Sequence, residues 1–218
     1  AGGAKVALDL NGCNTISLFG VQGFGKSYTM GVIAEMAVQP MPGINTLPSP
    51  LATVIFHYHK SDGYEPEFAT ALHPNAKVTE VERLAREYGA SPEGLRDMVL
   101  LVPQAKLEQR REEYPGIEVR PIRFASSELG ADGWKFLMGA VGNDSLYVKQ
   151  IVAIMQRARG KLTLAKLKSE IEDADLPKGL RKLAEARIAL AEDYIDDGVR
   201  LGEVLRPGRT VIVDLRDE

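Results

Sequence analysis

The sequence predicts an α/β fold in which a mostly parallel sheet is flanked by helices and interrupted by an all-helical insertion. Short apolar, β-branched runs alternate with helical patterns over the first 125 residues, as in folds built from strand–helix–strand units. From residue 126 to residue 205 the patterns are helical, and a strand pattern returns only at Thr210–Val213. We therefore expect a first core segment at 1–125, a helical subdomain at 126–205 and a returning core strand at 206–218.

The expected strands and helices follow from this patterning. The strands are Ala4–Leu10, Thr15–Phe19, Leu51–Tyr58, Met98–Val102, Ile117–Ile122 and Thr210–Val213, and the helices of the core are Tyr28–Ala37, Lys77–Tyr88 and Gln104–Tyr114. The apolar centre of Leu51–Tyr58 predicts burial on both faces. Alternating polar residues in Ile117–Ile122 favour an edge strand. The charged residues of Gln104–Tyr114, Arg110 among them, are interpreted as a solvated helix face.

The helical segment is expected to begin at Ser126 or Ser127, either of which is a suitable cap for a helix running through Met138. Three further helices are predicted at Ser145–Arg159, Leu162–Asp173 and Gly179–Tyr194. Between residues 157 and 187 there are nine Lys and Arg residues against five Asp and Glu. We interpret this as an ordinary mixed-charge helix surface and not as a nucleic-acid face, since a footprint would cluster its basic residues.

Composition excludes some classes of protein. The chain of 218 residues is 44% hydrophobic and 26% charged, with a net charge of −3, which is ordinary for a globular α/β protein. Its one cysteine, Cys13, excludes an internal disulfide, fits a reducing cytosol and is expected to be packed as a small residue. No apolar run approaches the roughly 20 residues of a membrane span, and no signal peptide is visible. We expect a cytoplasmic protein without a membrane partner.

The most specific motif is Gly20-Val-Gln-Gly-Phe-Gly-Lys-Ser27, which matches G-x-x-x-x-G-K-[ST] between a predicted strand and a predicted helix. The glycines let backbone N–H groups point at phosphate oxygens. Lys26 is expected to contact the β- and γ-phosphates as a catalytic residue, and the Ser27 hydroxyl to ligate Mg²⁺. The motif predicts binding of ATP with Mg²⁺ through Gly20, Gln22, Gly23, Phe24, Gly25, Lys26, Ser27 and Tyr28.

A phosphate-loop ATPase also needs an acid at the end of a neighbouring strand. Asp214 follows an apolar run, but Leu215 follows it in turn, and the pair Asp217-Glu218 comes only later. In one interpretation Asp214 is the Mg²⁺-associated acid, with Asp217 or Glu218 nearby. In the other, which we favour, the strand is a different core strand and the Asp-Glu pair lies beyond Glu218, because the visible pair is displaced by about 10 Å or more.

Histidines gather after the strand Leu51–Tyr58, at His57 and His59, with His73 further along. Such strand ends collect functional groups in α/β sheets. No cysteine or His-x-x-Cys partner accompanies them, so we favour a loop near the nucleotide, or a subunit contact, over a zinc site.

Beyond the phosphate loop, the layout resembles the amino-terminal portion of the ATPase core in the HerA/FtsK-like family. The residues concerned are 8–27, the turn Asp62-Gly63-Tyr64, the helical insertion and the run Arg206–Leu215. The family's strand-end turn is often acidic where this chain has His57-Tyr58-His59. The chain starts without Met and stops soon after a strand, and we expect the remainder of the core to be missing.

This resemblance implies a RecA-like core, ATP hydrolysis between the subunits of a hexameric homo-oligomer, and double-stranded DNA as the track. It also implies work with a nuclease or another effector, in end resection or anti-phage defence, and an arginine from the neighbouring subunit at the γ-phosphate. Arg120, Arg123, Arg206, Arg209 and Arg216 are the candidates for that arginine. The primary prediction is thus an ATP-driven DNA translocase. The alternatives are a nucleotide-gated assembly subunit with slow or no hydrolysis and, less favoured, a small-molecule kinase.

Overall fold

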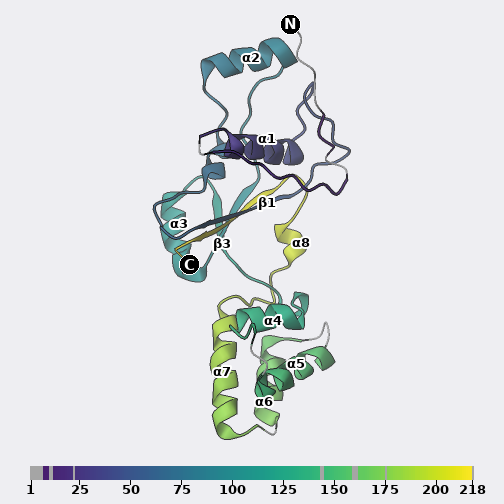
Figure 1. The fold of residues 1–218 in the computed structure, drawn as a ribbon, viewed down its shortest axis with the longest axis vertical. Coiled ribbons are helices and arrows are strands. Elements are labelled where there is room, and N and C mark those ends of the chain that lie inside the picture. Colours follow the sequence, from purple (N-terminus) through teal and green to yellow (C-terminus); the bar gives the residue numbers. More distant parts are fainter. Residues whose placement is uncertain are drawn as a thin grey trace. The chain divides into compact units, whose positions relative to one another are not determined.

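The computed structural model describes residues 7–9, 12–21, 23–142, 145–158, 162–174 and 176–217. The chain divides into two compact units (Figure 1). The first, here called the sheet unit, comprises residues 1–120 and 205–218, and the second, the helical unit, comprises residues 121–204. The sequence predicts that the helical unit begins after residue 125 and ends at residue 205, and in the structure it begins after residue 120 and ends at residue 204.

The sheet unit contains a sheet of four parallel strands in the order β1-β4-β2-β3. The strands are β1 (Thr53–His59), β2 (Met98–Val102), β3 (Glu118–Pro121) and β4 (Thr210–Arg216). The expected α/β class with a parallel, helix-flanked sheet is therefore confirmed. Strand β4 lies between β1 and β2, and its Val211 and Ile212 are fully buried, as expected for a central parallel strand.

The helical elements of the sheet unit are α1 (Lys26–Val38), η1 (Glu67–Leu72), α2 (Val78–Tyr88), η2 (Gln104–Lys106) and α3 (Leu107–Glu113). Helices α1 and α3 and the short helix η1 pack against the sheet through one shared apolar cluster, to which α2 contributes no residue. Val38 of α1 and Leu107 of α3 pack in the same cluster as Leu100 of β2 and Ile212 of β4. In parallel register Ile55 lies opposite Ile212. Both helices therefore pack on the sheet face that carries these residues.

Helix α1 runs antiparallel to β1, and this direction determines at which edge of the sheet the helix begins. The Leu51 N–H donates to the Ala37 carbonyl at 2.8 Å, and the Thr53 hydroxyl donates to the Ala34 carbonyl at 3.3 Å. The last turn of α1 is thus fixed beside the start of β1. Since 13 helical residues and seven strand residues both span about 20 Å, α1 begins toward the carboxyl edge of the sheet.

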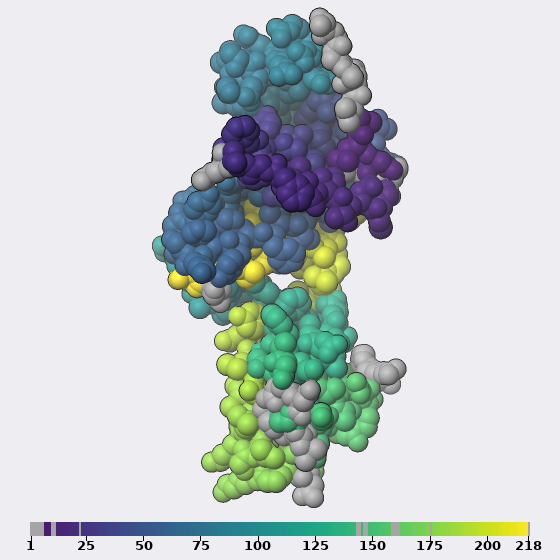
Figure 2. Space-filling model, in the orientation of Figure 1, coloured from purple at the N-terminus to yellow at the C-terminus, as the bar shows by residue number. Residues whose placement is uncertain are grey.

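Of the two strands predicted before α1, one is not met and the other is described only in part. Thr15–Phe19, predicted as the strand that enters the phosphate loop, has no strand pairing, and Phe19 is 91% exposed. Figure 2 shows the dark purple segment at the surface of the sheet unit. The β-branched residues supply strand propensity, but a strand exists only where a neighbour completes its hydrogen bonds. Of Ala4–Leu10, residues 7–9 are not in a strand and the others lie outside the described residues.

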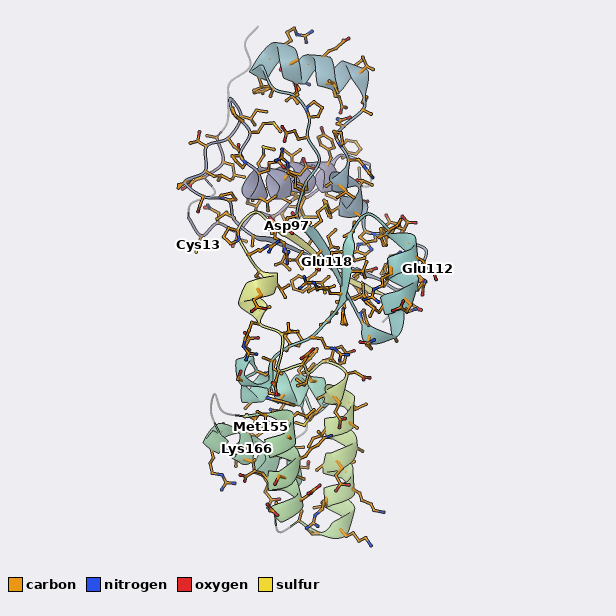
Figure 3. The ribbon with its side chains drawn as sticks, turned by 180° about the vertical axis from the view of Figure 1, so that it is seen from behind. Cys13, Asp97, Glu112, Glu118, Met155 and Lys166 are labelled. Carbon is orange, nitrogen blue, oxygen red and sulfur yellow. The ribbon has the colours of Figure 1, made fainter. Side chains whose placement is uncertain are left out.

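Strand β1 was expected to be buried on both faces, and this was wrong. Its burial alternates, and Phe56 and Tyr58 on one face are 74% and 59% exposed. The reason is that the cluster with α1 and α3 packs on the face that carries Ile55, and Phe56 and Tyr58 lie on the opposite face. Cys13, expected to be packed, is exposed (Figure 3), because the segment around it does not join the sheet.

The helical unit has a core of its own. Its elements are η3 (Ser126–Glu128), α4 (Ala131–Leu137), α5 (Leu146–Ala158), α6 (Leu164–Asp173), α7 (Lys178–Glu192) and α8 (Leu201–Val204). The fully buried Trp134, Ile151, Leu167 and Ile188 pack in one cluster, which Met155 of α5 joins (Figure 3). Helices α4, α5, α6 and α7 each bury an apolar side against this cluster, as amphipathic helices do.

A side-chain cap marks the start of α6 but not that of α4. Thr163 caps α6, since its hydroxyl accepts from the Lys166 N–H at 3.1 Å. Ser126 does not cap α4, whose N-cap is Gly130. Instead, Ser126 is buried and its hydroxyl accepts from the Leu164 N–H at 3.1 Å. Among the residues that the structure describes, no helix is long and apolar enough to cross a membrane.

Candidate functional site

The predicted phosphate loop leads directly into α1, which begins at Lys26. Gly23 and Gly25 have φ values of 84° and 76°, in the left-handed region that L-residues with a side chain rarely adopt. Nothing lies within 4 Å of the position that a Cβ would take at either glycine. Gln22 lies outside the described residues. The glycines are therefore needed for the backbone path, and not for a close packing contact.

Lys26 folds back over this loop. Its Nζ donates to the carbonyls of Gly20 and Val21, at 2.8 Å in each case. Phe24, Ser27 and Tyr28 around it are exposed. The arrangement places an ammonium group at the centre of a loop whose surroundings are open to a ligand.

The start of α1 has neither a side-chain cap nor an acidic residue in its first turn to neutralise it. This is also true of α7, whereas the first turns of α2, α3 and α4 carry Glu80, Glu108 and Asp132. The first N–H groups of α1 and the positive end of its helix dipole are thus available to an anion. Together with the Lys26 ammonium and the exposed Ser27 hydroxyl, this donor set fits a phosphate and its magnesium ion.

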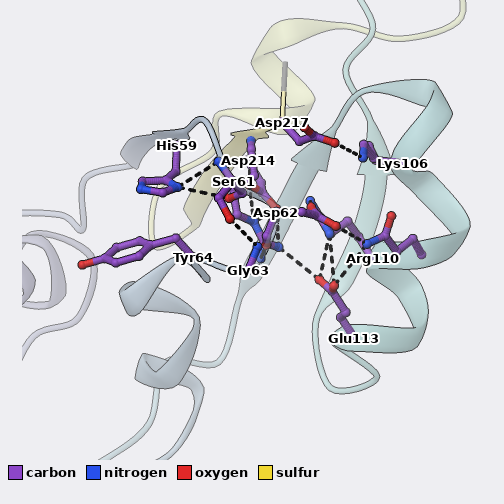
Figure 4. Close-up of polar contacts among 12 residues, drawn as sticks. His59, Ser61, Asp62, Gly63, Tyr64, Lys106, Arg110, Glu113, Asp214 and Asp217 are labelled. Atoms are coloured by element: carbon purple, nitrogen blue, oxygen red, sulfur yellow. Dashed lines mark hydrogen bonds and ion pairs between the residues drawn. The ribbon is translucent and has the colours of Figure 1, made fainter.

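A second group of polar residues lies at the carboxyl end of β4 (Figure 4). Asp214 is fully buried between two arginines: Arg110 Nε donates to its Oδ2 at 2.9 Å, and Arg216 Nε donates to its Oδ1 at 2.9 Å. Arg110 and Arg216 each also donate to Glu113, at 3.1 and 3.0 Å. We call these residues, with Asp62, the ion cluster.

The charges of the ion cluster stabilise one another. Burial opposes ionisation of Asp214, but the hydrogen bonds and charges of Arg216 and Arg110 outweigh it, so the pKa of Asp214 lies below its usual value. Burial likewise disfavours the charged form of Arg216, and Asp214 more than compensates, so the pKa of Arg216 is raised. The paired charges are hydrogen-bonded throughout, which is the condition for burying them.

Asp62 belongs to the turn after β1 and reaches the ion cluster from the surface. Its carboxylate accepts from Arg110 Nη2 and from Gln109 Nε2, the latter at 2.6 Å, and its main-chain carbonyl accepts from Arg216 Nη1 at 2.8 Å. The hydrogen bonds from Arg110 and Gln109 lower the pKa of Asp62 to about 2. Its side chain is 35% exposed, whereas that of Asp214 is 0% exposed.

The predicted histidines organise the same turn. His57 Nε2 donates to the Tyr64 carbonyl at 2.8 Å, and the Ser61 N–H donates to His59 Nδ1 at 3.0 Å. The His59 and Tyr64 rings are stacked with centroids 4.6 Å apart. His73 follows η1 and is exposed. Within the described ranges no group of three or more His, Cys, Asp or Glu residues is arranged to hold a metal ion.

The arginine candidates are distributed over the two units. Arg206 and Arg209 each donate from Nε to Asp97 at 2.9 Å. Figure 3 labels Asp97, and also Glu118 of β3. Both arginines precede β4 and so lie at the amino edge, opposite Asp214. Arg120 is paired with Glu118, Arg216 is buried in the ion cluster, and Arg123 lies in the helical unit.

Arg110 is the site residue that the sequence interpretation missed. Expected on a solvated helix face, it is 1% exposed. The physical reason is that the partners of Arg110 approach from other elements, since Asp62 and Asp214 are 48 and 104 residues away in the sequence. One local signal was present: Leu107, Arg110 and Tyr114 are spaced so that they share one helix face, and Leu107 is buried.

Comparison of the chain with protein-family models, with curated proteins and with solved structures finds no match.

Proposed function

We propose that the chain binds and hydrolyses ATP through the loop at residues 20–27. The observation that carries the proposal is the position of Lys26 at the first residue of an uncapped helix, with its Nζ hydrogen-bonded to loop carbonyls. Bound phosphate oxygens would take over these hydrogen bonds, while the first N–H groups of α1 would donate to the same anion. The Ser27 hydroxyl would hold the Mg²⁺ that accompanies ATP, which offsets the negative charge of the phosphates.

We further propose that this ATPase is the motor subunit of a HerA/FtsK-like, RecA-like hexameric ring that moves along double-stranded DNA in the cytoplasm. The support is the parallel sheet, the helical unit placed in the chain between β3 and β4, and the motif layout at residues 20–27, 62–64 and 206–215. A nuclease or another effector is the proposed partner. A fold of this class serves many functions, so the DNA-dependent activity needs its own test.

Nucleotide binding is tested by titrating a fluorescent ATP analogue with Mg²⁺ and by measuring phosphate release. Lys26→Ala should abolish phosphate release and weaken binding by about 100-fold, as expected for loss of a charge-assisted contact of about 3 kcal/mol. Lys182→Ala, which removes an exposed lysine in the helical unit, is the matched control and should behave as wild type. Equal binding by wild type and Lys26→Ala would refute the proposal.

DNA coupling is tested by phosphate release with and without double-stranded DNA, alongside sedimentation of the protein with ATP. We expect release to rise with DNA and the protein to sediment as a ring. If the rate of phosphate release is the same with and without DNA and the protein sediments as a monomer, the proposal of a motor is contradicted. The proposal that the chain binds ATP is not affected by that result.

A second candidate function is a nucleotide-gated assembly subunit with slow or no hydrolysis. One observation favours it: both carboxylate oxygens of Asp214 accept from buried arginines, so this acid is engaged in structural pairing. In that case the protein binds ATP tightly, Lys26→Ala abolishes binding, and wild type releases no phosphate. Tight binding without turnover selects this function over the motor.

A further inference from the structure

The turn of residues 61–64 is held from two sides. On the β1 side, His57 Nε2 donates to the Tyr64 carbonyl, the Ser61 N–H donates to His59 Nδ1, and His59 stacks on Tyr64. On the other side lies the ion cluster (Figure 4). A turn fixed by main-chain and side-chain contacts on both sides has little freedom to open.

Two buried arginines from different elements hold the same residue of this turn. Arg110, on α3, binds the Asp62 carboxylate, and Arg216, at the end of β4, binds the Asp62 main-chain carbonyl at 2.8 Å. Asp214 lies between the two guanidinium groups and orients both. Because the donors of a guanidinium are rigidly planar, the position of Asp62 is set relative to both α3 and β4.

The carboxylates of Asp62 and Asp214 differ in how far they are exposed to solvent. The side chain of Asp214 is 0% exposed, and that of Asp62 is 35% exposed. Each Asp62 oxygen accepts one hydrogen bond, from Arg110 or from Gln109, and a carboxylate oxygen can accept a second. Asp62 therefore presents a fixed anion with accepting capacity toward solvent, whereas Asp214 faces only protein.

The turn also lies at the edge of the sheet where α1 begins. It follows the carboxyl end of β1, and α1 runs antiparallel to β1. The next element, η1, packs on the first half of α1: a Cβ built on Gly31 would lie 3.3 Å from the Phe68 ring. Gly31 is five residues after Lys26, a rise of about 7.5 Å along the helix.

We propose that Arg110 and Arg216 are positioning residues that fix the Asp62 carboxylate at this edge, where it accepts a hydrogen bond from water at the nucleotide site. The nucleotide part of this inference rests on the proposed function. The positioning part rests on the contacts alone and is measured without nucleotide.

The first experiment follows hydrogen exchange of the amides of residues 61–64 in the nucleotide-free protein. Arg110→Met and Arg216→Lys should raise exchange there by about tenfold or more, because the turn then opens locally, and Arg110→Lys should recover part of the protection lost in Arg110→Met. Asp97→Asn, which alters the ion pairs at the opposite edge, is the control and should leave exchange at 61–64 unchanged. Unchanged exchange in both arginine variants overturns the positioning role.

The second experiment measures phosphate release by Asp62→Asn, a substitution of nearly equal size. We expect kcat to fall by about 100-fold, as for loss of an orienting group, with KM within about twofold of wild type. Wild-type kcat in Asp62→Asn overturns the assignment. If wild type neither binds ATP nor releases phosphate, the proposed function and the assignment of Asp62 both fail, while the exchange experiment still decides whether the arginines position the turn.

Discussion

Arg216 Nη1 donates to the main-chain carbonyl of Asp62 at 2.8 Å, across 154 residues of sequence. The side chain that makes this contact is fully buried at the end of the central strand β4, and the carbonyl belongs to the turn after the neighbouring strand. The contact joins the two segments of the sheet unit that lie on either side of the helical unit in the chain.

Arg216→Met should lower the free energy of unfolding by about 3–5 kcal/mol, since it leaves Asp214 as a buried carboxylate with one partner fewer. Urea unfolding monitored by circular dichroism measures the change. The control is Arg96→Met, which removes an ion pair whose side chains are 85% and 53% exposed and should cost less than about 1 kcal/mol. Equal losses in the two variants would show that the cluster adds no more than a surface pair.

The ion cluster should also make stability depend on pH in the acid range. The pKa of Asp62 falls from an ordinary 3.8 to about 2 in the folded protein, so its stabilising contribution is complete above the ordinary value and is lost as pH falls through about 2. The stability difference between wild type and Asp62→Asn should therefore be constant above about pH 5 and shrink between pH 4 and pH 2. Urea midpoints at several pH values measure it. Gln109→Ala should give an intermediate curve, and a difference that grows toward pH 2 contradicts the assignment.

Gly25→Ala should weaken nucleotide binding while leaving the rest of the fold intact. Its φ of 76° costs a residue with a Cβ about 1–2 kcal/mol, which corresponds to about 5- to 30-fold in affinity if the strain is relieved by moving the loop. Titration with a fluorescent ATP analogue measures this. Gly179→Ala, in the first turn of α7 with nothing within 4 Å of its Cβ position, should bind as wild type and be slightly more stable. Wild-type affinity in Gly25→Ala would contradict a role for this backbone geometry in binding.

The helical unit offers a test of its core through Trp134, the one tryptophan of the chain, which is fully buried there. Ile188→Ala should lower the free energy of unfolding reported by Trp134 fluorescence by about 2–5 kcal/mol, because Ile188 is 1% exposed in the same cluster. Leu190→Ala, on the same helix but 58% exposed, should cost less than about 1 kcal/mol. Similar losses of unfolding free energy in Ile188→Ala and Leu190→Ala would contradict the placement of Ile188 in the core and of Leu190 at the surface.

Strands with continuous apolar runs were predictable because burial on both faces leaves a clear pattern. Met98–Val102 has the predicted ends. Strand β4 runs three residues past the predicted Val213, because Asp214 and Arg216 neutralise each other and remain in the ladder. Thr15–Phe19 shows the limit: its local pattern is that of a strand, but pairing depends on a neighbour that a local pattern does not identify.

The turn into α1 was predictable because its signal is local, with glycines directly before a helical pattern, and phosphate binding by residues 20–27 stays a prediction. The ion cluster was not predictable, because its members are scattered over β4, α3 and the turn after β1. The charges of α3 look the same in sequence whether they face water or a partner. Only the fold brings Arg110 to Asp62 and Asp214, from 48 and 104 residues away.

The exposed side of β1 has a practical consequence for handling the protein. Among the described residues no strand pairs with its outer edge, and Val54, Phe56 and Tyr58 present an apolar row beside that edge. The strand Thr53–His59 contains no Asp, Glu, Lys or Arg to act as a gatekeeper, and such edges template aggregation. The purified chain should therefore precipitate increasingly with concentration, and Phe56→Lys should raise its solubility without changing the nucleotide binding proposed for residues 20–27.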